Sequence, residues 1–599
     1  MTKIMTAPLK LTAITLNGVG SYLHGERLEI RPLTLLCGTN GSGKSTWLRV
    51  LNLLRQSFEA GCLPFSLNVD DRVHNYEYTN AILTNQTAVG DIESERFVDF
   101  GPPGTIGLEF ETSEDWTLET NGVASTVTEP NTAYGFIWYG KLPPRTRLSV
   151  RLTQRNRDMT DDVAAAVSQI AELTIGDGFK ACFVRPALEE TWRLECSSGI
   201  LDGQNAGLDV VGLGTFVLEG LNPVPCDGTV TPFSDDFDQL LKRVTQRFRD
   251  VFAAFLSGCF YLSAVRVPHE YPSLRDWVFR GDEIRVPYPP GGRATREDHY
   301  FSFGDARYVG PHGEATFALE RRFAYCPMDL LEADPVLDHH LPLMFESFAS
   351  YWLDKLLDVR ILLKDDSSAA KGSHFAGGVA ESLSDPWTAE GRIPDGILSS
   401  DKPVVAEQIH SNNSIESPDV AWDYDPNDVV RFMHPCFGGE ELVPPARLSA
   451  GFHQVAPIVI QCGLAFQNEL VAIENPEVHL HPSLQLNLAE FLIRQAKSGK
   501  LILVETHSDL IIRRVMREIL EEDIGIGQEA IRVYFSDLDT AVAGYRVSSL
   551  KRLRLDEAGR IDWPDGFLGD DLHESRRLFN VMYGIVQTED MDDGSHEEK

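Results

Sequence analysis

The sequence predicts an α/β protein, in which a P-loop nucleotide-binding head is split by a large α+β insertion and followed by a small β-rich C-terminal extension. Two observations support this fold class. A glycine-rich loop lies between an apolar strand and a helix near the start of the chain, and strands alternating with helices return only near its other end. The stretch between them is too long for a loop and lacks the heptads of a long coiled coil, so one folding unit is encoded in two distant pieces.

The composition is that of a folded globular chain. The chain has 599 residues, 24% charged and 43% hydrophobic, a length that predicts more than one packed unit. Lys and Arg number 54 against 89 Asp and Glu, and the net charge of −35 repels nucleic-acid backbones, so contact with DNA would need a local basic patch. No apolar run is long enough to span a membrane and residues 1–10 lack the apolar core of a signal peptide, which predicts a cytoplasmic protein. The nine cysteines form no C-x-x-C pair, so no zinc knuckle or local disulfide framework is expected.

The first motif with chemical content is a phosphate-binding loop at residues 38–45. Residues 33–37 form an apolar strand and residues 46–54 have a helical apolar period, so the loop joins a strand to a helix. The loop fits the pattern G-x-x-x-x-G-K-[ST]; its glycines let backbone N–H groups converge on phosphate oxygens, Lys44 reaches the β- and γ-phosphates, and the Ser45 hydroxyl can ligate Mg²⁺. The expected nucleotide-binding residues here are Gly38, Asn40, Gly41, Gly43, Lys44, Ser45 and Thr46.

Two apolar strands near the other end of the chain finish in polar residues. Residues 470–473 end at Glu474, which places a carboxylate where a second Mg²⁺-holding acid is needed. Residues 501–504 are followed by E-T-H-S, so the imidazole of His507 is expected at a neighbouring strand end, where it can sense a γ-phosphate. Upstream of both, Ser449 and Gly451 open a helix, which suits another phosphate-binding helix N-terminus.

In this order and spacing, the loop, the Ser449–Gly451 signature, the acidic strand and the switch histidine resemble the ATP-binding-cassette ATPases of the SMC/RecF/OLD branch. The resemblance implies a head that binds ATP and Mg²⁺ and forms a homodimer through the heads, or a higher oligomer. A second head would then supply Ser449 and Gly451 across the interface. His479 and His481 correspond to the D-loop of that family, which competes with a zinc site as their explanation.

Further segments resemble bacterial standalone AAA-family ATPases found in anti-phage defence operons. The segments I-E-N-P-E-V-H-L-H-P and V-E-T-H-S-D are similar to two of their motifs, as are residues 261–266 and 309–314 within the insertion. Residues 562–567, D-W-P-D-G-F, resemble the W-P-x-G-F end of an uncharacterised C-terminal domain that many of these proteins carry. This resemblance implies a role in defence.

The sequence departs from transporter-type cassettes at one catalytic position. The Mg²⁺-holding acid is usually followed by a glutamate that orients the attacking water, and here that residue is Asn475, which cannot accept a proton. Either Glu477 substitutes for it, or hydrolysis is weak and ATP binding is the signal. The expected catalytic residues are Glu474, Asn475, Glu477 and His507.

Two other residues carry weaker expectations. Gln86 is a candidate Mg²⁺ ligand together with Ser45 and Glu474, with an ordinary loop residue as its alternative. Arg266, at a strand end in the insertion, either approaches phosphate or is an exposed or salt-bridged arginine.

These features predict five segments. Residues 1–115 are the N-terminal part of the head, residues 116–435 the inserted lobe with an irregular excursion at 365–428, and residues 436–529 the C-terminal part of the head. Residues 530–588 form a small domain and residues 589–599 an acidic tail.

Three functions compete. The first is an ATP-gated dimeric sensor, switch or scaffold that acts on a separate effector protein in a defence complex. The second is an SMC/RecF-like DNA-repair ATPase, which the charge and the absent coiled coil disfavour. The third is an OLD-like nuclease, for which Asp537 and Asp539 alone offer too few metal-binding carboxylates.

Overall fold

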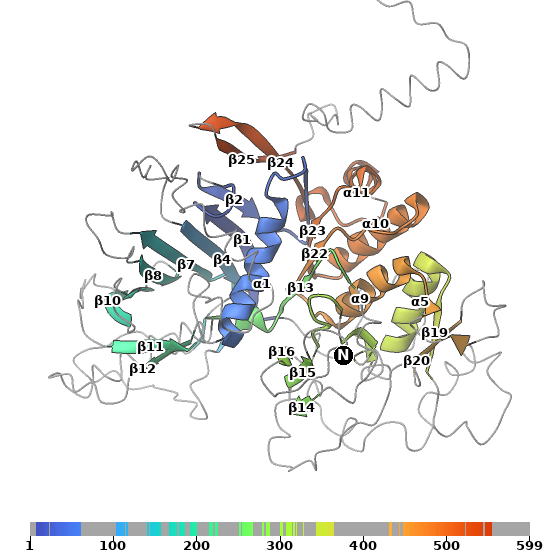
Figure 1. The fold of residues 1–599 in the computed structure, drawn as a ribbon, viewed down its shortest axis with the longest axis horizontal. Helices are drawn as coiled ribbons and strands as arrows, with labels where there is room; N and C mark the ends of the chain where they lie inside the picture. The colour runs from blue at the N-terminus through green and yellow to red at the C-terminus, as the bar shows by residue number, and fades with distance from the viewer. Residues whose placement is uncertain are drawn as a thin grey trace, which may run out of the picture.

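The computed structural model describes residues 7–60 apart from residue 23, a discontinuous set between residues 104 and 363, and residues 430–553 apart from short gaps. These residues form one sheet of six strands, one of nine, and several smaller sheets (Figure 1). The predicted mixed α/β class is confirmed.

The six-stranded sheet contains the predicted nucleotide-binding strands and draws on three distant parts of the chain. Its strands, in order across the sheet, are β13 (Cys259–Leu262), β22 (Leu470–Glu474), β23 (Leu501–Glu505), β3 (Leu33–Gly38), β24 (Ile531–Val542) and β25 (Tyr545–Arg552). The first five are parallel, and β25 returns antiparallel to β24. The four strands from β13 to β3 are buried at every residue, as expected for parallel strands covered on both faces.

Among the residues that the structure describes, the helices α5 (Phe345–Leu357), α9 (Ala450–Leu464), α10 (Pro482–Lys497) and α11 (Asp509–Glu521) cover one face of this sheet. The other face is covered by α1 (Lys44–Ala60), and helical residues at 251–252 and 254–256 belong to the same core. Alternate residues of β22 divide between two hydrophobic cores: Val471 and Ile473 pack with the four helices, Leu470 and Ala472 with α1. Figure 1 shows the four helices on the side of the sheet away from α1.

The nine-stranded sheet is antiparallel throughout and includes the first strands of the chain. In order, it contains β12 (Asn222–Pro225), β11 (Thr215–Glu219), β10 (Trp192–Gly199), β9 (Phe179–Arg185), β8 (Val167–Ile175), β7 (Arg147–Asn156), β4 (Gly104–Thr112), β1 (Leu9–Asn17) and β2 (Glu26–Glu29). β7 pairs directly with β4 and continues the sheet that β1 begins, so this sheet takes strands from both the expected head at 1–115 and the expected lobe at 116–435.

The later part of the expected insertion also returns to the head. β13 pairs with β22, and α5 packs against α10, where the rings of Trp352 and Phe348 lie 4.9 and 6.4 Å from that of Phe491. The smaller sheets contain β14 (Val278–Arg280), β15 (Glu283–Pro287) and β16 (Tyr300–Phe303); β17 (Pro327–Met328) and β18 (Leu343–Met344); β19 (Arg360–Leu363), β20 (Val430–Met433) and β21 (Leu442–Val443); and β5 (Trp116–Thr117) and β6 (Lys141–Leu142). The expected excursion, residues 365–428, lies outside the described residues.

The first part of the expected C-terminal domain at 530–588 contributes strands to the six-stranded sheet. After a short 3₁₀ helix (Gln528–Ala530), β24 and β25 are strands of the six-stranded sheet, and β24 pairs along the whole length of β3. Residues 554–599, with the W-P-D-G-F segment and the acidic tail at 589–599, lie outside the described residues.

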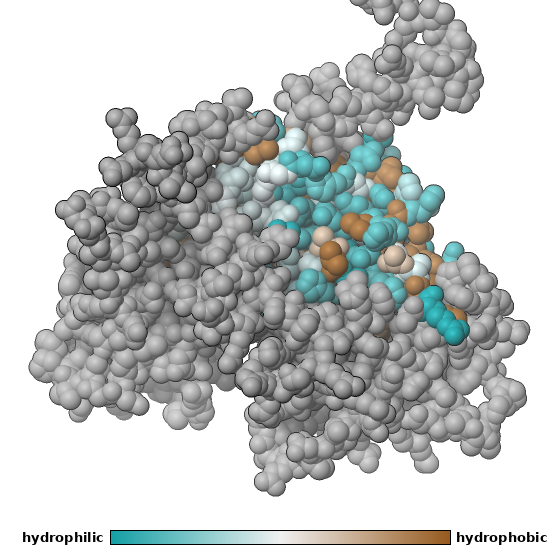
Figure 2. Space-filling model, in the orientation of Figure 1, coloured by the Kyte–Doolittle hydropathy of each residue, from teal (hydrophilic) through white to brown (hydrophobic). Residues whose placement is uncertain are grey.

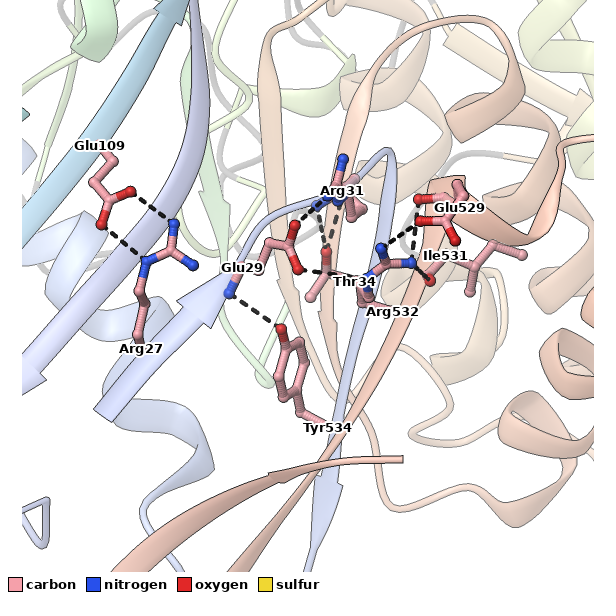
Figure 3. Close-up of polar contacts among 9 residues, drawn as sticks. All are labelled: Arg27, Glu29, Arg31, Thr34, Glu109, Glu529, Ile531, Arg532 and Tyr534. Carbon is pink, nitrogen blue, oxygen red and sulfur yellow. Dashed lines mark hydrogen bonds and ion pairs between the residues drawn. The ribbon is translucent and has the colours of Figure 1, made fainter. Parts of the chain in front are cut away.

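Polar contacts join the two large sheets where β2 lies beside β24 (Figure 3). The backbone N–H of Glu29 donates to the Tyr534 hydroxyl at 3.2 Å, and the Glu29 carboxylate forms ion pairs with Arg31 and, at 3.5 Å, with Arg532. Arg532 also pairs with Glu529 at 2.8 Å, and its side chain is only 5% exposed. This network holds the nine-stranded sheet against the strand that neighbours β3.

No helix in the described part of the chain is long and apolar enough to cross a bilayer. Figure 2 shows that the described surface over α10 and α11 is mainly hydrophilic, with scattered apolar residues. Leu486 and Leu520 are the large apolar residues exposed on these helices, and such isolated exposure is ordinary for a protein surface.

Candidate functional site

The phosphate loop connects β3 to α1 at the carboxyl edge of the parallel strands. Gly38 has a φ of 140°, and a Cβ there would lie 2.0 Å from the carbonyl oxygen of Ser536 on β24. Gly43 has a φ of 78°, and its Cβ would lie 2.3 Å from Ser21 Oγ. Both positions therefore require glycine, for backbone conformation and for space.

The tip of the loop is open and its base is braced. Asn40 and Gly41 are exposed, and no atom lies within 4 Å of a Cβ built on Gly41. Beneath them the Ser536 hydroxyl donates to Ser42 O at 2.6 Å, and the Tyr22 hydroxyl lies 2.8 Å from Ser536 Oγ. Burial raises the pKa of Tyr22 to about 12, so this hydroxyl stays protonated. An open tip on a fixed base suits the binding of phosphate oxygens by backbone N–H groups.

Lys44 begins α1 and keeps its charge inside the loop. Its ammonium donates to the carbonyl oxygens of Gly38 at 3.0 Å and Thr39 at 2.7 Å, and burial lowers its pKa. The N–H of Thr46 donates to Gly43 O at 3.0 Å, which closes the first turn of the helix. A phosphate at the loop would therefore meet both this ammonium and the positive end of a helix.

Two buried carboxylates lie beside the loop, where the sequence predicted one. Glu474 ends β22 and Glu505 ends β23, and they are register partners across these strands. Because β23 lies between β22 and β3, Glu505 is nearer to the loop, and Ser45 Oγ donates to its Oε1 at 2.7 Å. Glu474 instead accepts hydrogen bonds from Arg49 at 2.9 and 3.3 Å and from the Tyr261 hydroxyl at 2.9 Å. The structure thus brings Ser45 to Glu505 and not to Glu474.

The surroundings of Glu505 fit a cation. Burial and the charge of Glu474 raise the pKa of Glu505 to about 7, against the opposing influence of Ser45 and Lys44. Glu505 Oε2 is buried and has no hydrogen-bond partner in the described part of the chain. An orphaned carboxylate oxygen beside a hydroxyl is a donor set that suits Mg²⁺, which prefers oxygen ligands and keeps several from water and phosphate. Gln86, the other expected ligand, lies outside the described residues.

The segments that follow β22 and β23 contact each other. Asn475 has a φ of 42°, its N–H donates to Glu505 O at 2.8 Å, and its Oδ1 is buried without a partner among the described residues. Glu477 Oε1 accepts the backbone N–H of His507 at 2.7 Å, and burial raises the pKa of Glu477. The His507 side chain is exposed; burial of part of the ring and the charge of Lys44 lower its pKa, so it is neutral at pH 7. The expected catalytic residues are therefore gathered at one edge of the sheet.

The two signature residues differ in their surroundings. Ser449 is exposed and caps α9 by accepting the N–H of Phe452 at 3.3 Å. Gly451 is buried, and a Cβ there would lie 3.1 Å from the carbonyl oxygen of His479 and 3.4 Å from Leu480. Contact within the same chain therefore explains the glycine, whereas Ser449 is accessible to another molecule.

The histidines of the H-L-H-P segment have structural surroundings. His481 caps α10 by accepting the N–H of Ser483 at 3.3 Å, and His479 has a φ of 62°. Among the described residues, no group of three or more His, Cys, Asp and Glu could hold a metal ion.

Arg266 lies in neither of the places that the sequence suggested. It is fully buried and donates to the backbone carbonyl oxygens of Ser263, Gln454, Glu474 and Asn475. Burial lowers its pKa to about 10. Arg266 thereby ties the first turn of α9 to the end of β22.

The two middle motifs, residues 261–266 and 309–314, lie side by side next to this site. The Ser263 N–H donates to Pro311 O at 2.8 Å, and Ser263 Oγ lies 2.8 Å from His312 Nδ1. The insertion therefore contributes Tyr261 and Arg266 to the surroundings of Glu474.

Comparison with protein-family models identifies an ATPase domain in this part of the chain. Residues 398–512 match the model described as an AAA ATPase domain. The match includes Ser449, Glu474 and His507, and the fold adds the phosphate loop to it through β3. This part of the chain is therefore similar to AAA ATPase domains. A search of curated proteins found no match.

Among solved structures, the chain is similar to SMC head domains. An SMC head bound to the C-terminal winged-helix domain of ScpA shares 10% identity, covers 92% of this chain and 99% of its own, and gives a TM-score of 0.32. The SMC head domain from Thermotoga maritima shares 10% identity, the similarity covers 91% of this chain and 99% of that domain, and the TM-score is 0.30. The Smc head domain with an extended coiled coil bound to the C-terminal domain of ScpA, from Pyrococcus furiosus, shares 8% identity. The similarity covers 96% of this chain and 100% of that structure, and the TM-score is 0.28. Similarity at this level carries no conclusion about function.

Proposed function

We propose that this protein binds and hydrolyses ATP with Mg²⁺ and that two copies pair through their heads to complete each site. One observation carries the proposal: segments from distant parts of the sequence bring the phosphate loop, the Ser45 hydroxyl, two strand-end carboxylates and the His507 loop to a single sheet edge.

Each residue has a definite part in this proposal. The loop N–H groups and Lys44 bind the β- and γ-phosphates, and Ser45 offers its hydroxyl to the metal. Bound Mg²⁺ would neutralise phosphate charge and orient the γ-phosphate for attack. The family resemblance assigns Glu474 to the same ion.

Proton transfer is the weak step of the proposed reaction. Asn475 can hold a water but cannot accept its proton, so Glu477 is the proposed base, and its raised pKa makes it a better acceptor than an ordinary carboxylate. Its contact with the N–H of His507 links it to the segment that would sense the γ-phosphate. Hydrolysis is therefore expected to be slow.

Ser449 supports pairing of the heads. It is exposed at the N-terminus of a long buried helix, where a second copy could present ATP to the helix N–H groups. Gly451 lies in the first turn of α9 and lets this helix approach the segment at 479–480.

The resemblance to defence ATPases supports a cytoplasmic nucleotide-gated sensor, switch or scaffold that acts with a separate effector protein. The net charge of −35 weighs against the DNA-repair alternative. Asp537, a candidate for a nuclease centre, is an ion-pair partner of Lys551 at 3.7 Å. ATPase rates with and without DNA at moderate salt separate the first two functions.

The proposed function is tested by Lys44→Ala. Loss of a charge-assisted contact, worth about 1.5–3 kcal/mol, should lower ATP affinity at least about tenfold in calorimetry. Lys551→Ala, which removes an exposed lysine from β25, is the matched control and should bind ATP like the parent. Equal affinity of Lys44→Ala and the parent would contradict phosphate binding at this loop.

A further inference from the structure

Arg266 belongs to the expected insertion, yet its side chain reaches the edge of the six-stranded sheet where the expected catalytic residues lie. β13 pairs in parallel with β22, and Leu262 is the register partner of Ile473. The segments that follow these two strands therefore leave the sheet side by side, and Arg266 lies shortly after the end of β13. This arrangement places its guanidinium against the backbone of Glu474 and Asn475.

The guanidinium joins the end of β22 to helix α9. Nη1 donates to Glu474 O at 2.8 Å, Nη2 to Asn475 O at 3.1 Å, and Nε to Gln454 O in α9 at 2.8 Å. Nη1 also donates to Ser263 O. In return, the side-chain amide of Gln454 donates to Arg266 O at 3.0 Å. The contact between the insertion and α9 is therefore made in both directions.

The charge of this arginine indicates more than a structural role. The side chain is fully buried, and its hydrogen bonds in the described part of the chain go to carbonyl oxygens and none to a carboxylate. Burying a charge without an ion-pair partner is costly, and a neutral side chain would avoid that cost. The acids whose charges favour the guanidinium are Glu477 and Glu474, both at the catalytic edge. The positive charge is thus kept beside the groups expected to act on ATP.

The backbone that Arg266 holds has an uncommon conformation. Asn475 has a φ of 42°, in the left-handed region, and a residue other than glycine stays there where surrounding contacts determine it. Its N–H donates to Glu505 O at 2.8 Å, and its carbonyl oxygen accepts from Arg266. Distant segments therefore fix the peptide groups on both sides of Asn475. The path of the chain from there to Glu477 depends on them.

We propose that Arg266 is a positioning residue for ATP hydrolysis, which acts by fixing the segment from Glu474 to Glu477 against helix α9. Held in this way, Asn475 can orient the attacking water and Glu477 can accept its proton. The inference rests on the proposed function, because it assigns a residue of the expected insertion to the hydrolysis step proposed there.

The experiment measures single-turnover hydrolysis of bound ATP and, separately, ATP affinity by calorimetry. Arg266→Lys keeps the positive charge, but one ammonium replaces the planar fork that reaches both α9 and the end of β22. Hydrolysis should slow about 10–100-fold, because the water and its base are no longer held in line. ATP affinity should stay within about threefold of the parental value, since the phosphate loop is untouched.

Arg307→Lys is the matched control. Arg307 also joins α9 to β22, but at the amino edge of the sheet, away from the site. It donates to Leu464 O at the end of α9 at 3.3 Å and pairs with Glu469, directly before β22, at 2.8 Å. Arg307→Lys should lower the midpoint of thermal unfolding, as Arg266→Lys does, and leave the single-turnover rate within about threefold of the parent.

A double variant separates positioning from stability. If Arg266 acts through Glu477, Arg266→Lys should slow the Glu477→Gln protein less than about threefold, because the base that it positions is already lost.

Gln454→Met is a milder change that carries the same test if Arg266→Lys does not fold. It removes the hydrogen bond to Arg266 O together with an amide oxygen that has no partner among the described residues. Hydrolysis should slow about threefold to tenfold, and this effect should also disappear in the Glu477→Gln protein.

The outcomes distinguish this inference from the proposed function. A parental rate in Arg266→Lys, equal losses of rate in Arg266→Lys and Arg307→Lys, or an undiminished effect in the Glu477→Gln protein would overturn the positioning role alone. A parent protein that does not bind ATP, or binds it without hydrolysing it, would overturn the proposed function and this inference with it.

Discussion

At the scale of single residues, the geometry of the site depends on the hydrogen bonds that fix the residues after β22. Glu477 is fixed by the N–H of His507, and Asn475 has a left-handed backbone whose N–H bonds to Glu505 O. Asn475 is thus held by the last residue of β23, and Glu477 by the segment that follows it. A change at Glu477 is therefore transmitted to His507 through a hydrogen bond, whereas a change of charge without a change of shape tests its chemistry alone.

Glu477→Gln should slow ATP hydrolysis about 10²–10⁴-fold, because a glutamine cannot accept the proton of the attacking water. Its Oε1 can still accept the His507 N–H, so ATP affinity should be retained and bound ATP should accumulate. Single-turnover hydrolysis and filter binding measure the two effects.

Asn475→Glu is the companion variant and should accelerate turnover if the site shares the geometry of other cassettes. A Glu477→Gln protein that hydrolyses ATP at the parental rate would show that Glu477 is structural.

The sequence predicted these residues unevenly, for a physical reason. The phosphate loop is a local pattern, and its strand, glycines and helix were found where expected. Glu505 is part of the E-T-H-S segment, but the sequence did not predict its contact with Ser45. That contact depends on β23 lying next to β3, and no local pattern encodes this pairing. The spacing of Arg49, four residues after Ser45, places the two residues on the same side of the helix. Spacing alone could not predict that Arg49 pairs with Glu474 at the end of β22.

At the scale of elements, a buried lysine next to β23 contacts the helices α9 and α10. Lys500, directly before β23, donates to Cys462 O in α9 at 2.6 Å and to Gln495 Oε1 in α10 at 2.8 Å. Burial lowers its pKa to about 8, although the nearby Cys462 and Glu469 favour its charge. The contact between α9 and α10 on this face of the sheet is therefore stabilised by the Lys500 side chain, whose pKa lies near 8.

The stability contributed by this group should rise with pH. In the unfolded chain Lys500 titrates near 10.5 and in the folded chain near 8, so between these values the unfolded state binds more protons and raising the pH favours folding. From pH 8 to 9.5 the gain is on the order of 2 kcal/mol.

Urea unfolding of the parent and Lys500→Met at both pH values isolates the effect, because the variant lacks this gain while other groups cancel in the difference. An identical pH dependence in the two proteins would mean that Lys500 keeps its proton throughout this range.

The elements themselves were predicted better than their partners. The strands at 33–37, 470–473 and 501–504 were expected within one residue of their observed ends. The pairing of strands was not predicted. β7 pairs with β4 and β24 with β3, and these are contacts between distant segments whose apolar alternation is compatible with many partners.

At the scale of the whole molecule, the proposed head pair makes a prediction about mixtures. Lys44→Ala disables one loop, and Ser449→Arg places bulk and charge at the exposed start of α9. In a mixed pair one site receives both defects and the other receives none, so a 1:1 mixture should recover about a quarter of the parental activity if copies pair at random.

Ser449→Arg is preferred to a change at Gly451, whose Cβ would press on His479 in the same chain and confuse the test. Unfolding midpoints of both variants control for loss of the helix cap, which costs about 1 kcal/mol. A mixture as inactive as its parents, with both proteins folded and paired, would exclude a shared site.

The placement of β3 has a consequence for synthesis. Both neighbours of β3 in the sheet, β23 and β24, come from the C-terminal part of the chain, so a ribosome exposes the phosphate loop long before either neighbour exists. At typical elongation rates this interval is on the order of a minute. During that time β3, an apolar segment that is buried at every residue in the finished protein, has neither of its neighbouring strands to pair with and is exposed to aggregation. Nascent or prematurely terminated chains that lack β23 and β24 therefore carry the phosphate loop without the sheet that positions it.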